Sequence, residues 1–402
     1  MHVEHAGAVE ELRAGTGAAP APQPKSNASV DANGLRGALP GDGWSPLWTG
    51  LARVGGVLPP AGRTNDDPWA LLGGRQHAPG RGRADGRAVG TIGRRIDHVG
   101  PRFDAIVPPQ GYAWWYVDAI SGDGRYGLTI IGFVGSVFSP YYKASGRGRP
   151  EEHCAINVAL YGPRSNRWTM TERGSAKTNR SIDTFEVGPS AMHWDGDALV
   201  IDICETACPI PFPVRGKVRL YPEQISQVAF GLHEHGQHLW HPIAPRARIE
   251  VSMDSPDIRW SGSGYFDSNF GREPLEAGFS EWQWSRAHLR DDVAVIYEGE
   301  RRDGSDFAMA LRYDRQGNWH DAALPPSARL PGTTFGMPRR TRGTDAKILK
   351  TWENAPFYSR STLVTEIYGE RVNAVHESLS MDRFVSPIVQ LMLPFRMPRI
   401  TR

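Results

Sequence analysis

Three polar side chains recur at every second position in a short, glycine-flanked segment of the chain. The segment reads GSGYFDSNFG from Gly262 to Gly271 and spaces Tyr265, Asp267 and Asn269 two residues apart. Alternate side chains of an extended strand lie on one face, so these three groups are expected to converge. Aromatic residues flank them at Trp260, Phe266 and Phe270. Polar groups that converge in apolar surroundings are typical of a small-molecule pocket. The alternative is an exposed polar strand face with an Asx turn.

Histidines are dense in a second segment, HEHGQHLWH, which runs from His233 to His241. His233 and His235 would share a strand face, so one interpretation is a metal site. The zinc motif H-E-x-x-H is not met, because Gln237 stands where its second histidine belongs. We favour the interpretation that one or two of these histidines are catalytic or orienting and that the others line a solvated rim.

Two other motifs have structural explanations. The segment GDGRYG at Gly122–Gly127 matches G-x-G-x-x-G, but dinucleotide binding requires a helix after it, and the following run LTIIGFVGSVF is strand-like. A β-hairpin turn is therefore predicted. Cys204 and Cys208 lack the C-x-x-C spacing, and three cysteines in all are too few for a disulfide framework. They are interpreted as small buried residues of a protein from a reducing compartment.

The elements that must position these residues are predicted to be strands. Apolar and polar residues alternate over 246–253 and 307–314, and turn signals follow at short spacing (Asp123-Gly124, Asp195-Gly196, Asp303-Gly304 and Gly317-Asn318). No helical periodicity of three turns is found. The prediction is an all-β, antiparallel protein with two barrel-like halves, 103–245 and 246–402, joined at a Pro-rich seam around His241–Pro245.

The first 102 residues differ from the rest in composition. They are rich in Ala, Gly, Pro and Arg, and their only aromatic residues are Trp44, Trp48 and Trp69. Such a segment buries too little apolar surface to offset its ordering entropy, so we predict a disordered leader. The alternative is a basic arm that contacts anionic membrane or nucleic acid. The net charge of the whole chain, +2, gives no argument for a nucleic-acid partner.

Three blocks, in this order, resemble the carotenoid 1,2-hydratases, or hydroxyneurosporene synthases, of purple photosynthetic bacteria. The blocks are FDAIVPPQGYAWWYVDAISGDGRYGLTIIGFVGSVFSPYY, HLWHPIAPRARIEV and GSGYFDSNFG. The resemblance extends from about Phe103 to the C-terminal LPFRMPR stretch, with the leader outside it. It implies two lipocalin-like β-barrel domains, no cofactor and no metal. It also implies a hydro-lyase that adds water to the C1=C2 bond of acyclic carotenoids such as neurosporene or lycopene.

The resemblance further implies that His238, Trp240, Tyr265 and Asp267 are essential. Hydration of an unactivated alkene requires a carboxylic acid to protonate C2, so Asp267 is expected to be the acid, with its pKa raised by desolvation among its aromatic neighbours. We expect Trp240 and Tyr265 to stabilise the resulting tertiary cation. His238 is expected either to deprotonate the water or to tune Asp267.

A C40 carotenoid is insoluble in water, so the enzyme is expected to collect it from a bilayer or from a neighbouring carotenoid enzyme. No segment is long enough to span a membrane. The apolar tail at Phe384–Phe395 is a candidate interfacial segment, beside Arg396 and Arg399, and otherwise a final barrel strand or docked C-terminal segment. Peripheral attachment to the cytoplasmic side of the inner membrane is thus predicted. The alternatives to the hydratase function are a non-catalytic, lipocalin-like carotenoid or lipid carrier and an isoprenoid cyclase-like enzyme.

Overall fold

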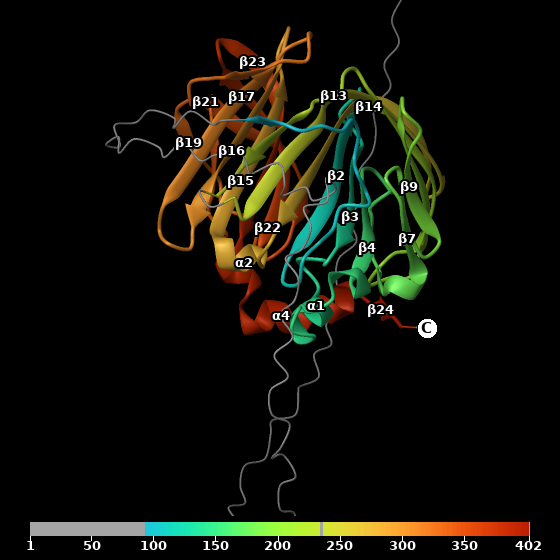
Figure 1. Cartoon of the computed structure of the whole chain (residues 1–402). Coiled ribbons are helices and arrows are strands. Elements are labelled where there is room, and N and C mark those ends of the chain that lie inside the picture. The colour runs from blue at the N-terminus through green and yellow to red at the C-terminus, as the bar shows by residue number, and fades with distance from the viewer. Residues whose placement is uncertain (1–92, 234–235, 402) are drawn as a thin grey trace, which may run out of the picture. The chain divides into compact units, whose positions relative to one another are not determined.

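The computed structural model describes residues 93–233 and 236–401, in which most regular structure is β-strand (Figure 1). The larger of its sheets has 15 strands. Its main path is β24 (Arg399–Ile400), β6 (Glu172–Arg173), β4 (Cys154–Tyr161), β3 (Gly127–Val134), β2 (Tyr112–Ser121), β14 (Asp257–Gly271), β13 (His238–Ser255), β11 (Pro213–Pro222), β10 (Leu199–Thr206), β9 (Ser190–Trp194), β8 (Thr184–Val187) and β7 (Thr178–Arg180). Three short strands pair beside this path: β1 (Arg94–Arg95), β5 (Arg167–Met170) and β12 (Val228–Gly231).

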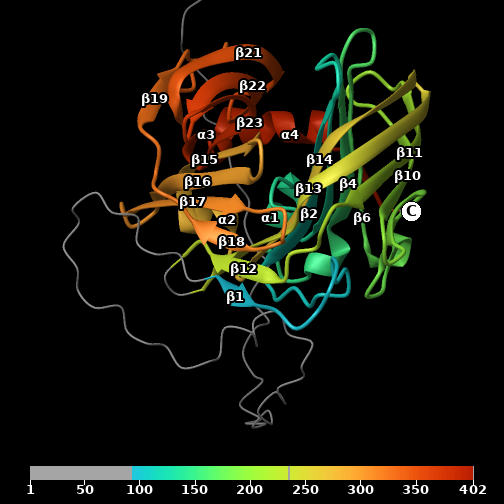
Figure 2. The same cartoon turned by 90° about the horizontal axis from the view of Figure 1, so that it is seen from above.

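A second sheet has seven strands, which all lie between β14 and β24 in the chain (Figure 2). Its order is β18 (Trp319–Asp321), β17 (Asp306–Tyr313), β16 (Val293–Arg301), β15 (Phe279–His288), β23 (Glu370–Ser380), β22 (Tyr358–Ile367) and β21 (Thr344–Asn354). A separate pair is formed by β19 (Ser327–Leu330) and β20 (Arg339–Arg342). The helices are α1 (Pro140–Ala144), α2 (Leu275–Gly278), α3 (Met381–Phe384) and α4 (Pro387–Arg396), and 3-10 turns lie at Pro150–Glu152 and Ser175–Lys177.

The turn signals lie where the sequence predicts them. Gly122–Gly127 connects β2 to β3, so the G-x-G-x-x-G match is a hairpin turn and the hairpin prediction is confirmed. The other three turn signals connect β9 to β10, β16 to β17 and β17 to β18, which pair antiparallel in each case. The alternation over 246–253 and 307–314 likewise belongs to β13 and β17. The prediction of a mostly β, antiparallel protein is confirmed.

Two apolar cores result from this arrangement, and β2 contributes to both. Trp115 and Val117 point into a core enclosed by the larger sheet, while Trp114 and Tyr116 point into a second core that includes Trp282 and other side chains of the seven-stranded sheet. Because successive side chains of a strand face opposite ways, one strand fills both cores. The second core is the one that positions the functional site.

The predicted seam lies inside a strand. Residues 245 and 246 are both inside β13, which continues from His238 to Ser255. Pro242 and Pro245 lack an N–H for the strand ladder, and the pairing of β13 with β14 shifts register between His241 and Ala247. The prolines therefore disturb the ladder without ending the strand. The smaller sheet begins only after β14, which ends at Gly271.

The ends of the described region also differ from the predictions. Residues 1–92 of the predicted leader lie outside the described residues. In its described part, Arg94 and Arg95 pair with β12 and Ile96 is buried, so this part is not disordered as predicted. The C-terminal apolar segment forms α3 and α4 rather than a final strand. None of the helices described combines the length and apolar character that crossing a membrane requires. The three cysteines are free. Cys154 is buried as predicted, but Cys204 and Cys208 are partly exposed, so the prediction that they are buried is wrong.

Candidate active site

Asp267 lies on the face of β14 that points into the core between the two sheets. Tyr265 and Asn269 share this face because they are two residues away on either side. On the neighbouring strands, Tyr116 of β2 pairs with Asp267, and Trp240 of β13 pairs with Asn269. The predicted convergence of Tyr265, Asp267 and Asn269 is thus what the strand register produces.

Two neutral donors bind the same oxygen of Asp267. The Nε1–H of Trp240 and the hydroxyl of Tyr265 each donate to Oδ2, at 2.8 Å in both cases. The other oxygen, Oδ1, is 3.5 Å from Nδ2 of Asn269. Because Oδ2 already accepts two hydrogen bonds, Oδ1 is the oxygen that would carry a proton and present it to a neighbour.

Burial controls the protonation of Asp267. Its side chain is 4% exposed, and desolvation raises the pKa of the carboxyl to about 7, against the opposing effect of the bonds from Trp240 and Tyr265. The aromatic residues that desolvate it are not the predicted ones. Phe266 and Phe270 belong to the other core, because alternation turns them to the opposite face of β14. The apolar surroundings of Asp267 are instead provided by the second core, in which the Tyr265 ring lies 5.2 Å from the Trp284 ring.

A cavity of about 130 Å³ opens beside Asp267 and Asn269. Its other lining residues are mostly aromatic or apolar: Trp114, Tyr116, Ile131, Phe133, Phe138, Trp168, Met170, Trp282, Trp284, Tyr297, Ala355, Phe357, Tyr358, Leu379 and Met397, with Thr129, Asn157, Glu353 and Glu377. Pockets that enclose a whole drug-sized ligand have volumes of about 300–1,000 Å³. This cavity is smaller, so its volume fits the end of a long apolar molecule.

Trp240 and Tyr265, also predicted for the site, contact Asp267 but do not line this cavity. Trp240 and Tyr265 are both fully buried, and what they present to Asp267 is an N–H and an O–H. Tyr116, Trp282 and Trp284 are among the aromatic residues that do line the cavity.

His238 is fully buried at the start of β13 and makes two hydrogen bonds of its own. Its Nε2 lies 3.1 Å from the Glu273 carboxylate, and its Nδ1 lies 2.9 Å from the Tyr112 hydroxyl. A carboxylate only accepts, so Nε2 donates to Glu273, and in a neutral ring Nδ1 accepts from Tyr112. The bond from His238 lowers the pKa of Glu273. Both ring nitrogens are therefore engaged.

The other histidines of this segment bear on the alternative interpretation, a metal site. His235 lies outside the described residues, and His241 points its Nε2 to the Ser226 carbonyl, at 2.9 Å. Burial lowers the pKa of His241 to about 3. Within 93–233 and 236–401, no group of three or more His, Cys, Asp or Glu residues is placed to hold a metal ion.

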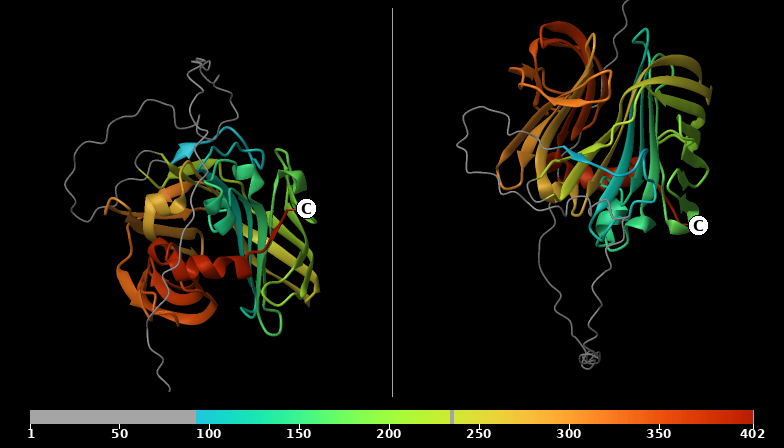
Figure 3. Two further views of the ribbon diagram at one scale, coloured as in Figure 1. Left: turned by 90° about the horizontal axis from the view of Figure 1, so that it is seen from below. Right: turned by 45° about the horizontal axis from the view of Figure 1, so that its top comes forward.

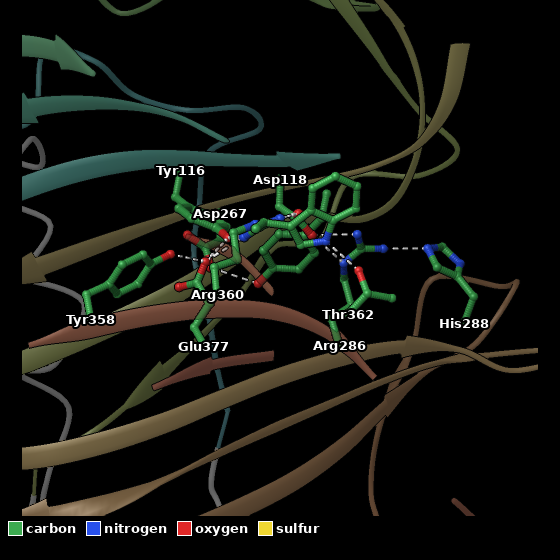
Figure 4. Close-up of polar contacts among 11 residues, drawn as sticks. Tyr116, Asp118, Asp267, Arg286, His288, Tyr358, Arg360, Thr362 and Glu377 are labelled. Carbon is green, nitrogen blue, oxygen red and sulfur yellow. Dashed lines mark hydrogen bonds and ion pairs between the residues drawn. The ribbon is translucent and has the colours of Figure 1, made fainter. Parts of the chain in front are cut away.

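The seven-stranded sheet contributes a polar network that the sequence motifs did not reveal (Figure 4). Glu377 of β23 accepts hydrogen bonds on Oε1 from Tyr116 at 2.6 Å, from Tyr358 at 2.8 Å and from Nη1 of Arg360 at 2.6 Å. Arg360 also pairs with Asp118, which is bound in turn by Arg286 at 2.5 Å. No local motif marks Glu377, which stands in an ordinary alternating strand, so only its position opposite Asp267 identifies it.

Comparison with known proteins places the chain in a family. The family model for carotenoid hydratase CrtC matches residues 130–402. The acyclic carotenoid 1,2-hydratases of Thiocapsa roseopersicina and Rubrivivax gelatinosus are 47% and 46% identical to this chain, over 92% and 94% of it and over 93% and 95% of their own lengths. The chain belongs to the carotenoid hydratase family. The family resemblance of the sequence blocks is confirmed.

The matches to these carotenoid hydratases also correct the predicted extent of the resemblance. A match that covers 92% of the chain cannot leave all of residues 1–102 outside, so part of the leader is shared with these relatives. Among solved structures, a putative AttH from Nitrosomonas europaea has a TM-score of 0.46 and 16% identity, over 70% of this chain and 99% of its own.

Proposed function

We propose that the protein is an acyclic carotenoid 1,2-hydratase, which adds water to the C1=C2 bond at the ψ-end of neurosporene, lycopene or a related carotenoid. The observation that carries the proposal is Asp267, a carboxyl with a pKa raised to about 7 beside an apolar cavity. Protonation of an unactivated alkene needs a carboxylic acid that is still protonated near neutral pH, and an ordinary Asp is ionised there. No cofactor is required for this reaction.

In this reaction, Asp267 donates its Oδ1 proton to C2 and leaves a tertiary cation at C1. The bonds from Trp240 and Tyr265 to Oδ2 stabilise the carboxylate that forms, since hydrogen bonds to an anion favour the charged form. The cation is stabilised by the π faces that line the cavity, Trp282 and Trp284 among them, each worth about 2 kcal/mol when desolvated. His238 has the role of orienting β13, and with it Trp240, through its bonds to Tyr112 and Glu273.

The architecture we propose for this function is a pair of lipocalin-like barrels preceded by a leader. The protein attaches to the cytoplasmic face of the inner membrane, where it takes carotenoid from the lipid or from neighbouring carotenoid enzymes. Support comes from α4, the red helix in the left view of Figure 3. Its exposed side chains include an apolar patch formed by Ile388, Leu391, Met392 and Phe395. These residues share one helix face, and Met397, just beyond α4, lines the cavity. We call these four residues the α4 patch.

A second candidate function is a carotenoid or lipid carrier without chemistry, which would share the apolar cavity. Asp267 argues against it, because a carrier gains nothing from burying a carboxyl and pays a desolvation cost. A cyclase-like enzyme, the other alternative, would also protonate an alkene but would form a ring without incorporating oxygen.

The test is incubation of the purified protein with lycopene in H₂¹⁸O, followed by mass spectrometry of the carotenoids. The hydratase is expected to give a product heavier by one labelled water, and Asp267→Asn is expected to give none while still binding carotenoid. Bound but unchanged lycopene with the unmodified protein would favour the carrier. An isomer of unchanged mass would favour the cyclase.

A further inference from the structure

A second carboxylate faces the same cavity from the opposite sheet. Asp267 lies on β14 of the larger sheet and Glu377 on β23 of the seven-stranded sheet, and both line the cavity. Tyr116 connects them: its backbone pairs with Asp267 across two adjacent strands, and its hydroxyl donates to Glu377. Strand neighbours of this kind have Cβ atoms about 4.5–5.5 Å apart. A group bound in the cavity can therefore contact both carboxyl groups.

The two carboxyl groups have opposite kinds of partner. Asp267 is bound only by neutral donors, whereas Glu377 is held at 2.6 Å by the guanidinium of Arg360, which is fully buried. A cation at this distance stabilises a carboxylate, while burial among neutral groups stabilises the acid. Environments that favour opposite protonation states are how paired carboxyl groups divide acid and base roles.

The hydrogen bonds to Glu377 leave one of its oxygens available. Tyr116, Tyr358 and Arg360 all bind Oε1, so Oε2 can accept a hydrogen bond from a water molecule in the cavity. The remaining carboxyl of the lining, Glu353, is bound by Tyr161 at 2.5 Å, and desolvation raises its pKa. Glu353 is thus held toward the neutral form and does not compete for a base role.

We propose that Glu377 is the general base of the hydration, a catalytic residue that takes a proton from the attacking water. The inference rests on the proposed hydratase function. The alkene π electrons form the new C2–H bond with the Asp267 proton, and the oxygen of water then bonds to the C1 cation. The proton that water loses goes to Oε2 of Glu377. Exchange with solvent returns Glu377 to the carboxylate and Asp267 to the acid, so one water is consumed and no oxidant or reductant is needed.

The hydrogen bonds of His238 exclude it from the role of general base. Its Nδ1 lone pair is used by the Tyr112 hydroxyl and its Nε2–H by Glu273, so a neutral His238 has no free lone pair to accept a proton from water. His238 also does not line the cavity. Of the two predicted roles for His238, deprotonating the water or tuning Asp267, the hydrogen bonds exclude the first, and any effect on Asp267 is indirect, through Trp240 on the same strand.

The first test compares Glu377→Gln with Glu298→Gln on lycopene in H₂¹⁸O. Glutamine preserves the acceptor for Tyr116 and Tyr358 but cannot take the proton, so kcat is expected to fall by about 10²–10⁴-fold, the usual contribution of a general base. Glu298 is a matched control, since it is 3% exposed and paired with Arg342 at 2.6 Å but does not line the cavity. Its variant is expected to keep kcat near the unmodified value. Equal kcat in both variants and the unmodified protein would overturn the base role.

A second measurement separates the base from a merely structural role. Azide adds to a cation without losing a proton, so it needs no base. In Glu377→Ala, azide is expected to restore carotenoid consumption and to give a product that has gained HN₃, with its proton from Asp267. Asp267→Asn is expected to show no such rescue. Consumption that stays low with azide, in a folded variant that binds carotenoid, would overturn the proposal.

The activity of the unmodified protein distinguishes a failure of this inference from a failure of the proposed function. If it fails to hydrate lycopene or neurosporene in the same experiment, the hydratase function itself fails. If it hydrates them and the Glu377 variants match it, only the assignment of the base fails.

Discussion

The hydrogen bonds to Asp267 and its burial have opposite effects on the pKa of its carboxyl group, and their balance sets that pKa. Burial raises the pKa of this carboxyl, whereas the donors of Trp240 and Tyr265 lower it, and the result is about 7. In the proposed reaction, both partners orient the protonated Asp267 and stabilise the anion after proton transfer. Their hydrogen-bond donors thus matter to the proposed chemistry more than their rings do.

Tyr265→Phe tests this view, because it keeps the ring and removes one donor. Without the bond from Tyr265 the pKa of Asp267 should rise, so the loss of activity at alkaline pH should begin at a higher pH than in the unmodified protein. At lower pH, kcat should fall because the anion is less stabilised. A pH profile of kcat checks both effects. Trp240→Phe should have the same effects. If the alkaline limb of the kcat profile stays at the same pH in both variants, these hydrogen-bond donors do not control the pKa of Asp267.

Asp267→Asn should change how stability depends on pH. In the unfolded chain the pKa of Asp267 has its ordinary value of 3.8, but in the folded protein it is about 7, so the free energy of unfolding falls as pH rises between these values. The full cost above pH 7 is about 4 kcal/mol. Urea unfolding should therefore show the variant gaining stability relative to the unmodified protein from pH 4 to pH 8. A difference that is constant with pH would contradict the pKa.

Some of the site was predictable from the sequence. Tyr265, Asp267 and Asn269 converge because two-residue spacing on a strand is a local property. The cation-stabilising roles expected of Trp240 and Tyr265 were assigned from residue type, but their donors point to Asp267. Glu377 was missed because its importance comes from Arg360 and from the facing strand, not from its neighbours in sequence.

The hairpin of β13 and β14 serves both the larger sheet and the site. The C-terminal part of β13 pairs with β11 and fills the enclosed core, while its N-terminal part pairs with β12 and positions Trp240. Proline residues lie between the two parts, where the register shifts. The Pro-rich stretch was the basis for the predicted domain seam, and it lies inside one long strand.

The contact between β2 and the seven-stranded sheet depends on one buried carboxylate. Asp118 of β2 pairs with Arg286 of β15 and Arg360 of β22, and all three side chains are 2% exposed or less. Asp118→Ala leaves two buried guanidinium groups without this partner and should cost about 3–5 kcal/mol of unfolding free energy.

Urea unfolding checks this loss, with Asp202→Ala as the control. Asp202 pairs with Lys217 at 2.9 Å, but both side chains are largely exposed, so its removal should cost only about 0–1 kcal/mol. Similar losses in the two variants would show that the buried network contributes no more than a surface ion pair.

The α4 patch connects the cavity with the surface of the molecule. Cys208 donates from Sγ to the Phe395 carbonyl at 2.9 Å, so the turn bearing the exposed Ile210 and Phe212 adjoins the end of α4. On the inner side, Phe384 of α3 packs against Phe138 and Phe357, which line the cavity. An exposed apolar area next to a carotenoid cavity suits a lipid surface.

Replacing Leu391 and Phe395 together by Asp should therefore weaken attachment to lipid. These side chains are each 74% exposed, so their replacement should leave the fold intact. Sedimentation with anionic phospholipid vesicles should show reduced binding, while activity on detergent-dispersed carotenoid persists. Leu349→Asp, at a 55% exposed position on β21, is the control and should bind as the unmodified protein does. Equal binding by all three would contradict a role for the α4 patch.

By itself, the sequence determined the β-rich class, the hairpin turns, the family and Asp267 as the candidate acid. These depend on side-chain period, on turn residues and on motifs that lie within a few residues of one another. Only the tertiary structure decided which aromatic faces surround Asp267, that His238 is fully engaged, and that Glu377 stands across the cavity. The physical reason is that desolvation and charge pairing depend on which strands face each other, and the facing strands here belong to different sheets.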